Sequence, residues 1–348
     1  MIEEHDSKTP RAAIARAEAA ARSERWEEAL TAYQDAVETA RFHPEGAAAE
    51  ADALRGAAIV RIRLGEWQEA LRDLAESRLI AERMGDAGRL ALADNARGAL
   101  EFERGNWEEA ERRYRAARES AGGVEDLSLL MEIENNEGAL WAARGERARS
   151  EEHFRRALRH FEELERHPCG ARAMNNLGMI LMEDGRVAEA DAFYGRALEE
   201  CKRTGDLTLA ATVMINRGRL ALVIDEPIRA HAVAATAAEI AARLGNGPLA
   251  ADAVCLQGAV ARAGGRWDEA RACLREALER SADGRVPLAE AETWTELAEL
   301  ELARERFDEA ARALRQSRRC YLSLGSTAEA ERLERRLAAL EAPTMEVP

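Results

Sequence analysis

The sequence has few aromatic residues, almost no lysine and no long apolar stretch. Aromatic residues make up 5% of the chain, whereas 47% of its residues are hydrophobic and 33% are charged. This profile is typical of a long-helix protein that packs through leucine and small residues, and it argues against intrinsic disorder. Acidic residues outnumber basic ones by 65 to 50, for a formal net charge of -15. Nucleic acid is therefore a poor candidate partner, because the overall field repels phosphate.

Patterns for a membrane anchor, a disulfide framework or an active site are also missing. The first twenty residues contain no apolar signal segment, and no run approaches the roughly 20 apolar residues of a membrane span. We therefore expect a cytoplasmic protein without membrane contact. The five cysteines are scattered without a C-x-x-C pair, which indicates reduced thiols. No H-E-x-x-H, G-x-S-x-G or Walker motif occurs, so we predict neither enzyme activity nor a cofactor.

Three histidines, His153, His160 and His167, share one side of a predicted helix, and Glu163 follows the second of them. A spacing of seven residues places neighbours about 10 Å apart along a helix axis, too far to share one ion at bonds of about 2 Å. We interpret them as solvated or packing histidines and predict no metal site.

An internal repeat accounts for most of the chain. Its marker is an aromatic residue preceded by glycine and followed by Glu-Ala, as in GEWQEAL at Trp67 and GRWDEAR at Trp267. The marker position recurs every 40 residues, except for a first step of 41 with an extra residue near the turn at His43 to Gly46. It is filled by Trp26, Trp67, Trp107, Arg147, Val187, Pro227, Trp267 and Phe307.

Three further positions per repeat hold only Gly, Ala or Ser, as close helix crossings require. They lie nine residues before the marker and three and ten residues after it. Apolar residues between them recur at spacings of three and four, which predicts two amphipathic helices per repeat. These helices are separated at Gly65, Gly105, Gly145, Gly185 and Gly265.

This pattern resembles the tetratricopeptide repeat, with a period of 40 rather than 34 residues. Four repeats end with glycine before a polar residue, at Gly85, Gly205, Gly245 and Gly325. Such an ending is similar to that of an adaptor subclass seen in kinesin light chains, Partner-of-Inscuteable-type scaffolds and bacterial regulators.

The resemblance implies an all-α solenoid in which eight repeats form one right-handed superhelix over residues 11–326. Residues 327–342 then form a capping helix, with a leucine stripe at Leu333, Leu337 and Leu340. Residues 1–10 and 343–348 are expected to be a flexible N-terminus and a flexible tail.

Asparagine clusters in two adjacent positions of the first helices, although it is a mediocre helix former. The resemblance implies that these helices line a concave groove, where Asn136, Asn176 and Asn216 would form a ladder. A carboxamide offers a donor and an acceptor, so it can pair with the backbone of an extended peptide without reading its side chains. Met can adapt to different partners and Arg219 adds a cation. The predicted peptide-binding residues are Asn95, Asn135, Asn136, Asn175, Asn176, Asn216, Met179, Met182 and Arg219, with Ala139, Ala142, Leu222 and Val223 as small or apolar neighbours.

Two alternatives remain open for these positions. Asparagine there could simply bond a neighbouring helix, although the ladder is absent in repeats 1, 2, 7 and 8. The chaperone-binding clamp for a terminal carboxylate expects lysine where this chain has Asn135 and Ala143, which disfavours that mode. Arg55, Arg63 and Arg219 leave another acid-binding mode open.

We therefore predict a non-enzymatic protein-interaction scaffold that binds an extended segment of a partner in the groove of repeats 3 to 6. A peptide-sensing regulator that acts through a partner, and a self-assembling homo-oligomer, are the alternatives.

Overall fold

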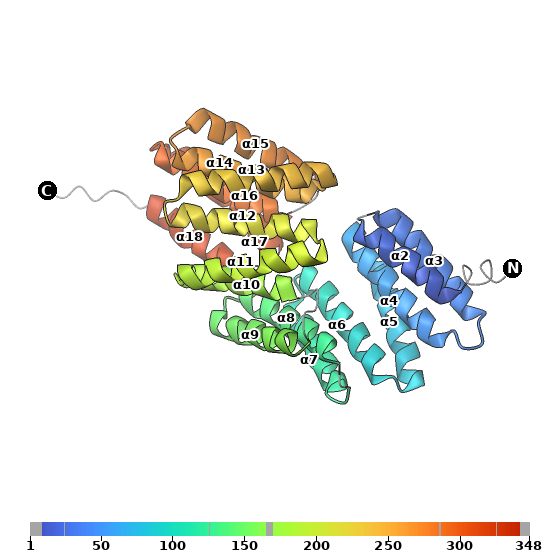
Figure 1. Cartoon of the computed structure of the whole chain (residues 1–348). Helices are drawn as coiled ribbons and strands as arrows, with labels where there is room; N and C mark the ends of the chain where they lie inside the picture. The colour runs from blue at the N-terminus through green and yellow to red at the C-terminus, as the bar shows by residue number, and fades with distance from the viewer. Residues whose placement is uncertain are drawn as a thin grey trace. The chain divides into compact units, whose positions relative to one another are not determined.

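The computed structural model describes residues 9–23, 25–124, 126–164, 170–284, 287–324 and 326–341. All regular secondary structure in these ranges is helical, with seventeen helices and no strand (Figure 1). The predicted all-α fold is thus confirmed. His167, Gly325 and the tail at 343–348 lie outside the described residues.

Two helices correspond to each predicted repeat. The first helices are α2 (Pro10–Arg22), α4 (Ala47–Leu64), α6 (Ala87–Glu103), α8 (Leu127–Ala143), α10 (Gly170–Glu183), α12 (Leu207–Val223), α14 (Gly247–Ala263) and α16 (Pro287–Ala303). The second helices are α3 (Trp26–Arg41), α5 (Trp67–Met84), α7 (Trp107–Ala121), α9 (Arg147–Glu163), α11 (Val187–Thr204), α13 (Pro227–Leu244), α15 (Trp267–Gly284) and α17 (Phe307–Ser323). The last helix, α18, spans Thr327–Glu341.

The chain divides into two compact units, residues 1–140 and 141–348. In the first unit α2, α4 and α6 each pack on their own second helix, and α4 also packs on α2 and α6. In the second unit the same hairpins recur, and α12 and α14 each contact the first helices on both sides, from α10 to α16. Each unit is therefore a stack of helical hairpins. A single continuous solenoid stays a prediction.

Glycine and a polar residue together shape the connections between repeats. Gly85 ends α5 with a φ of 65°, in the left-handed region where a side chain would be strained. The next residue, Asp86, caps α6, since its Oδ1 accepts a hydrogen bond from the backbone N–H of Arg89 at 2.9 Å. The same pair of roles recurs at residues 205–206 and 245–246. The polar residue after each glycine therefore starts the next helix.

The small-residue positions mark close helix crossings, as predicted. A Cβ atom added at Gly98 would lie 2.5 Å from the ring of Tyr114, and one at Gly178 would lie 2.6 Å from that of Tyr194. These distances are below van der Waals contact, so only glycine allows the two helices of these hairpins to pack. Where serine replaces alanine, its hydroxyl bonds the adjoining first helix, as Ser77 Oγ donates to the carbonyl oxygen of Ala51 at 2.7 Å.

The last helix covers the end of the second unit. Leu333 and Leu337 are buried against Leu314 and Tyr321 of α17, with Leu340 packed beside them. The predicted leucine stripe thus covers a surface that the final repeat would expose. In the described part of the chain, no helix combines the length and apolar character needed to cross a bilayer.

Candidate functional site

The asparagines belong to one face of the first helices, which we call the asparagine face. It comprises three positions per first helix: the two adjacent asparagine positions and the position four residues after the first of them. On α4 these are Arg55, Gly56 and Ile59. Residues i, i+1 and i+4 point to one side of a helix, so each first helix presents the three together.

In the first unit an amide pair links two successive first helices. Asn136 on α8 donates from Nδ2 to Oδ1 of Asn95 on α6 at 3.0 Å. Asn95 and Asn135 are 6% and 8% exposed, whereas Asn136 is half-buried. The carbonyl oxygen and second N–H of the Asn136 amide make no hydrogen bond to the described residues. Asn136 therefore keeps both an acceptor and a donor at the surface.

In the second unit an equivalent pair lies deeper. Asn216 on α12 donates from Nδ2 to Oδ1 of Asn175 on α10 at 2.9 Å. Asn175 in turn donates to Oδ1 of Asn176 at 3.4 Å. Asn175 and Asn216 are 3% and 5% exposed, while Asn176 is half-buried. Both pairs join residues 41 apart, so the second position of one repeat bonds the first position of the preceding repeat. The asparagines thus also tie neighbouring repeats together.

Arg219 is held inside the second unit. Its Nη1 donates to Oδ1 of Asn216 at 3.4 Å, and its Nη2 donates to Oε2 of Glu292 on α16 at 2.6 Å. Each member of this ion pair keeps 31% of its side chain exposed. The predicted cation is therefore paired with an acid of its own chain, which the repeat pattern did not reveal. The 73 residues between the partners place them two repeats apart.

A third charged group lies close to this ion pair. Burial raises the pKa of Asp252 on α14 to about 7, and the negative charge of Glu292 adds to the rise while Arg219 opposes it. Asp252 and Glu292 occupy the same position in successive repeats, 40 residues apart, so two acids compete for one guanidinium. The group forms a partly buried polar network on α12, α14 and α16.

Apolar surface accompanies the amides on α10 and α12. The side chain of Met179 is 36% exposed and that of Val223 is 65% exposed, while Met182 is half-buried. Asn175 Nδ2 lies 3.9 Å from the Met179 sulfur, so the thioether borders the amide pair. An apolar side chain of the asparagine face therefore lies beside the amides on α10.

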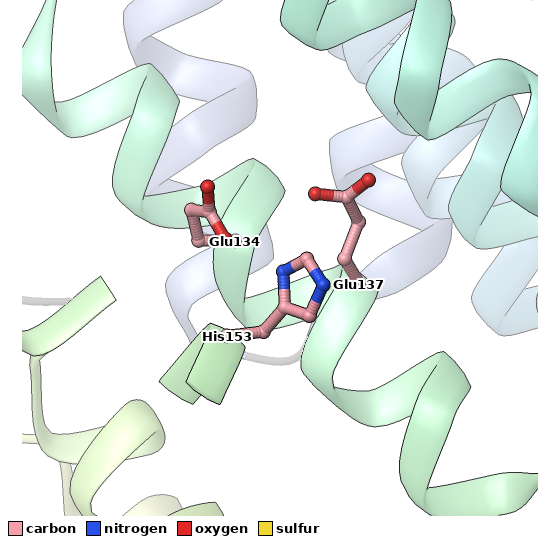
Figure 2. Close-up of side chains that lie close together, drawn as sticks. All are labelled: Glu134, Glu137 and His153. Atoms are coloured by element: carbon pink, nitrogen blue, oxygen red, sulfur yellow. The ribbon is translucent and has the colours of Figure 1, made fainter. Parts of the chain in front are cut away.

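One group of side chains could hold a metal ion by residue type. Figure 2 shows Glu134, Glu137 and His153, whose potential ligand atoms lie within 4.8 Å of one another. Glu137 is 3.2 Å from the guanidinium of Arg118, which already supplies a positive charge. In the preceding repeat the positions of Glu134 and His153 hold an acid and an arginine that form an ion pair. This parallel favours polar packing over a metal site.

Hairpins of this kind, stacked through successive first helices, define a helical-repeat protein. Family models of the tetratricopeptide repeat match residues 129–199, 230–285 and 258–321. The chain is a tetratricopeptide-repeat protein. No comparison confirms the kinesin light chain subclass, which stays a prediction. A sequence search of curated proteins found no match.

Solved structures share this fold over most of the chain. A Rap protein complexed with competence and sporulation factor is 16% identical, with a TM-score of 0.65, over 95% of this chain and 97% of its own. NprR in complex with its cognate peptide NprX is 11% identical, with a TM-score of 0.61, over 83% of both chains. BtubC (BKLC) from P. vanneervenii is 25% identical, with a TM-score of 0.53, over 64% of this chain and 92% of its own. The likeness to the Rap protein and to NprR, at such low identity, shows the fold alone.

Proposed function

We propose that the chain is a non-enzymatic scaffold that binds an extended peptide segment of a partner protein on the asparagine face of repeats 3 to 6. The observation that carries this proposal is the Asn136 amide, which is tied to Asn95 by one bond and keeps a donor and an acceptor available. An extended backbone presents an N–H and a C=O that such an amide can pair. Repeats 3 and 4 contribute residues of the first unit, and repeats 5 and 6 contribute residues of the second.

The asparagines would then have different roles. Asn136 and Asn176 are half-buried and would contact the peptide backbone, with Met179 and Met182 packing on its side chains. Asn95, Asn135, Asn175 and Asn216 are buried, so they would hold their neighbours in position. Arg219, paired with Glu292, would act chiefly within this network rather than as a free binding site for a partner's acid.

The named ligand of one similar structure supports a peptide partner. NprR, whose fold this chain shares, was solved with its cognate peptide. A peptide-sensing regulator that acts through a second protein is therefore the alternative, and it would use the same face. In that case the captured ligand would be a short free peptide instead of a segment of a folded protein.

The test is an affinity capture from the source cell's lysate. Wild-type protein is compared with the triple variant Asn136→Ala, Asn176→Ala and Asn216→Ala, after circular dichroism has established equal helicity and a fully folded state of each protein at the capture temperature. Asn106→Ala is the matched control, because Asn106 is exposed and lies off the asparagine face. Ligands captured by wild type and control but lost from the triple variant would support the proposal. Identical captures by all three proteins would refute the role of the asparagine face.

A further inference from the structure

A cavity of about 510 Å³ lies within the first unit, and no asparagine lines it. Residues of α2, α3, α4 and α6 line it, and its apolar wall includes Ile14, Trp26 and Ile59. Its charged lining consists of two arginines and three acids: Arg55, Arg89, Glu18, Asp52 and Asp86. A volume of this size is in the range of pockets that bury small organic ligands, about 300 to 1,000 Å³.

The two arginines of this cavity differ in what they bind. Arg89 donates from Nε and Nη2 to the carboxylate of Asp52, at 3.1 and 2.8 Å, and from Nη1 to Asp86 at 2.6 Å. Arg55 forms neither a hydrogen bond nor an ion pair with any residue that the structure describes, and its Nε is buried without a partner. A buried N–H without an acceptor is unfavourable, so a ligand that supplies an acceptor would relieve a cost already present.

The repeat register explains why Arg55 has no partner. It occupies the first asparagine position of repeat 2, where repeats 3, 4 and 5 have Asn95, Asn135 and Asn175. In the observed amide pairs, a residue 41 positions later donates to that first position. Forty-one positions after Arg55 stands Ala96, which has no polar side-chain atom. Between α4 and α6, the amide pair is therefore replaced by a cation at the first position and no polar side chain at the second.

Glu18, an acid that lines the same cavity as Arg55, is exposed and only weakly paired. Its nearest cation is Arg22 at 4.0 Å, and 53% of its side chain is exposed. Burial raises the pKa of Tyr33, Glu18 raises it further and Arg55 opposes the rise, so both charges act on the same hydroxyl. Glu18 would therefore repel an anion at Arg55 without neutralising that guanidinium.

We propose that this cavity binds a carboxylate joined to an apolar group. The carboxylate would accept hydrogen bonds from Arg55, in the bidentate geometry that guanidinium favours, and the apolar body would lie against Trp26 and Ile59. The charge of Arg55 and the apolar wall select this class together: a neutral ligand leaves the guanidinium without an acceptor, and a second acid group would face Asp52 and Glu18. No asparagine lines this cavity, so ligand binding here is independent of peptide binding on the asparagine face.

The probe for this chemistry is 3-phenylpropionate, with 3-phenylpropionamide as its uncharged counterpart, titrated into the full chain by calorimetry or ligand-observed NMR. We expect the carboxylate to bind at least tenfold more tightly than the amide, because a charge-assisted bond replaces a neutral one. Arg55→Leu should weaken the affinity for 3-phenylpropionate at least tenfold. Arg72→Leu, at an exposed arginine on α5 that does not line the cavity, should leave it unchanged.

A gain-of-affinity variant protects this test against a failure of Arg55→Leu to fold. Glu18→Gln removes the repelling acid at an exposed position and should tighten binding of 3-phenylpropionate about threefold, an effect reduced by salt. Equal binding of the acid and the amide, no loss in Arg55→Leu, or no binding at 10 mM probe would each overturn the proposal.

Two capped peptides then distinguish the sources of the carboxylate. One ends in phenylalanine with a free carboxylate, and the other is amidated and carries an internal Glu-Phe pair. Tighter binding of the first identifies a peptide terminus, and tighter binding of the second identifies an acidic side chain. If both bind more weakly than 3-phenylpropionate, the ligand is a small free acid.

Discussion

The asparagine faces of α4 and α12 each carry an arginine, Arg55 at the first position of the face and Arg219 at the third, but the two side chains are used in opposite ways. On α4, Arg55 faces a cavity and has no acceptor among the described residues. On α12, Arg219 is bonded to Asn216 and to Glu292. One cation is available to a ligand, whereas the other is used by the fold.

The difference lies in residues far along the chain. Glu292 stands 73 residues after Arg219 and completes its pair, while Ala96, in the position that would pair with Arg55, offers nothing. A repeat thus fixes where a side chain lies, and the neighbouring repeats decide whether it is free.

The largest effect is expected for Arg219→Leu. Without its cation, Glu292 remains partly buried near Asp252, and breaking a pair of this kind costs about 2 to 3 kcal/mol of unfolding free energy. Arg55→Leu removes no internal bond and should change that free energy by less than about 0.5 kcal/mol. Urea unfolding at pH 7 measures both. Equal losses in the two variants would contradict the contrast.

Asp252→Asn should stabilise the protein at pH 8. The pKa of Asp252 is raised to about 7 in the folded state, so the folded chain binds more protons than the unfolded chain between about pH 4 and 7. Its contribution to stability is therefore lost as pH rises through that window, and the variant should regain about 1 to 3 kcal/mol at pH 8. The unfolding free energy, measured from pH 4 to 8, should become flatter in the variant.

Asp52→Asn is the matched control, because Asp52 occupies the same repeat position in the first unit. It accepts two bonds from Arg89, so its neutralisation should cost about 1 kcal/mol at pH 8 instead of stabilising the chain. A gain in stability for Asp52→Asn would show that the bonds from Arg89 do not make Asp52 differ from Asp252.

Breaking each of the two amide pairs should lower the free energy of unfolding by different, smaller amounts. Asn216→Ala leaves Oδ1 of Asn175 buried without its donor, which should cost about 1 to 2 kcal/mol. Asn136→Ala should cost about 0.5 kcal/mol, because Asn136 is half-buried and water can replace it. Thermal unfolding of the single variants checks the order, and the reverse order would place the structural role at Asn136.

The smallest effects concern the turn between the two helices of a repeat. Gly65 and Gly105 in the first unit take a φ of 76° and 75°, and Gly145, Gly185 and Gly265 in the second unit take 71° to 78°. At the same turn of two other repeats in the second unit, Asp225 and Glu305 take 58° and 57°. Left-handed backbone is strained for residues with a side chain, so Asp225→Gly and Glu305→Gly should each stabilise by about 0.5 to 1 kcal/mol. Gly65→Ala should lose a similar amount in the same melting experiment.

The repeat period, the small-residue crossings and the glycine turns could all be predicted from the sequence. Each depends on residues within one hairpin, as Gly98 beside Tyr114 illustrates. The pairing of side chains between repeats could not be predicted, since it depends on the rotation of one hairpin against the next. The Asn216 bond to Asn175 was foreseen only as an alternative, and the Arg219 bond to Glu292 was not foreseen.

The grouping of Glu134, Glu137 and His153 could have been predicted from the sequence. The helical spacing of His153 relates it only to the other histidines and to Glu163, whereas the acids near it, Glu134 and Glu137, are on the first helix of its own repeat. The positions of Glu134 and His153 hold Asp94 and Arg113 one repeat earlier, where the guanidinium donates to the buried carboxylate at 3.2 Å. Aligning charged residues across repeats would have indicated the grouping of Glu134 with His153.

The most direct test of the binding face is site-specific photocrosslinking in the source cell's lysate. A benzoylphenylalanine residue replaces either Met179, on the asparagine face of α10, or Leu322, on α17. Both native side chains lie in the second unit, with exposed fractions of 36% and 47%. We expect a specific crosslinked partner from position 179 and none from position 322. A partner crosslinked from position 322 and absent from position 179 would contradict this expectation.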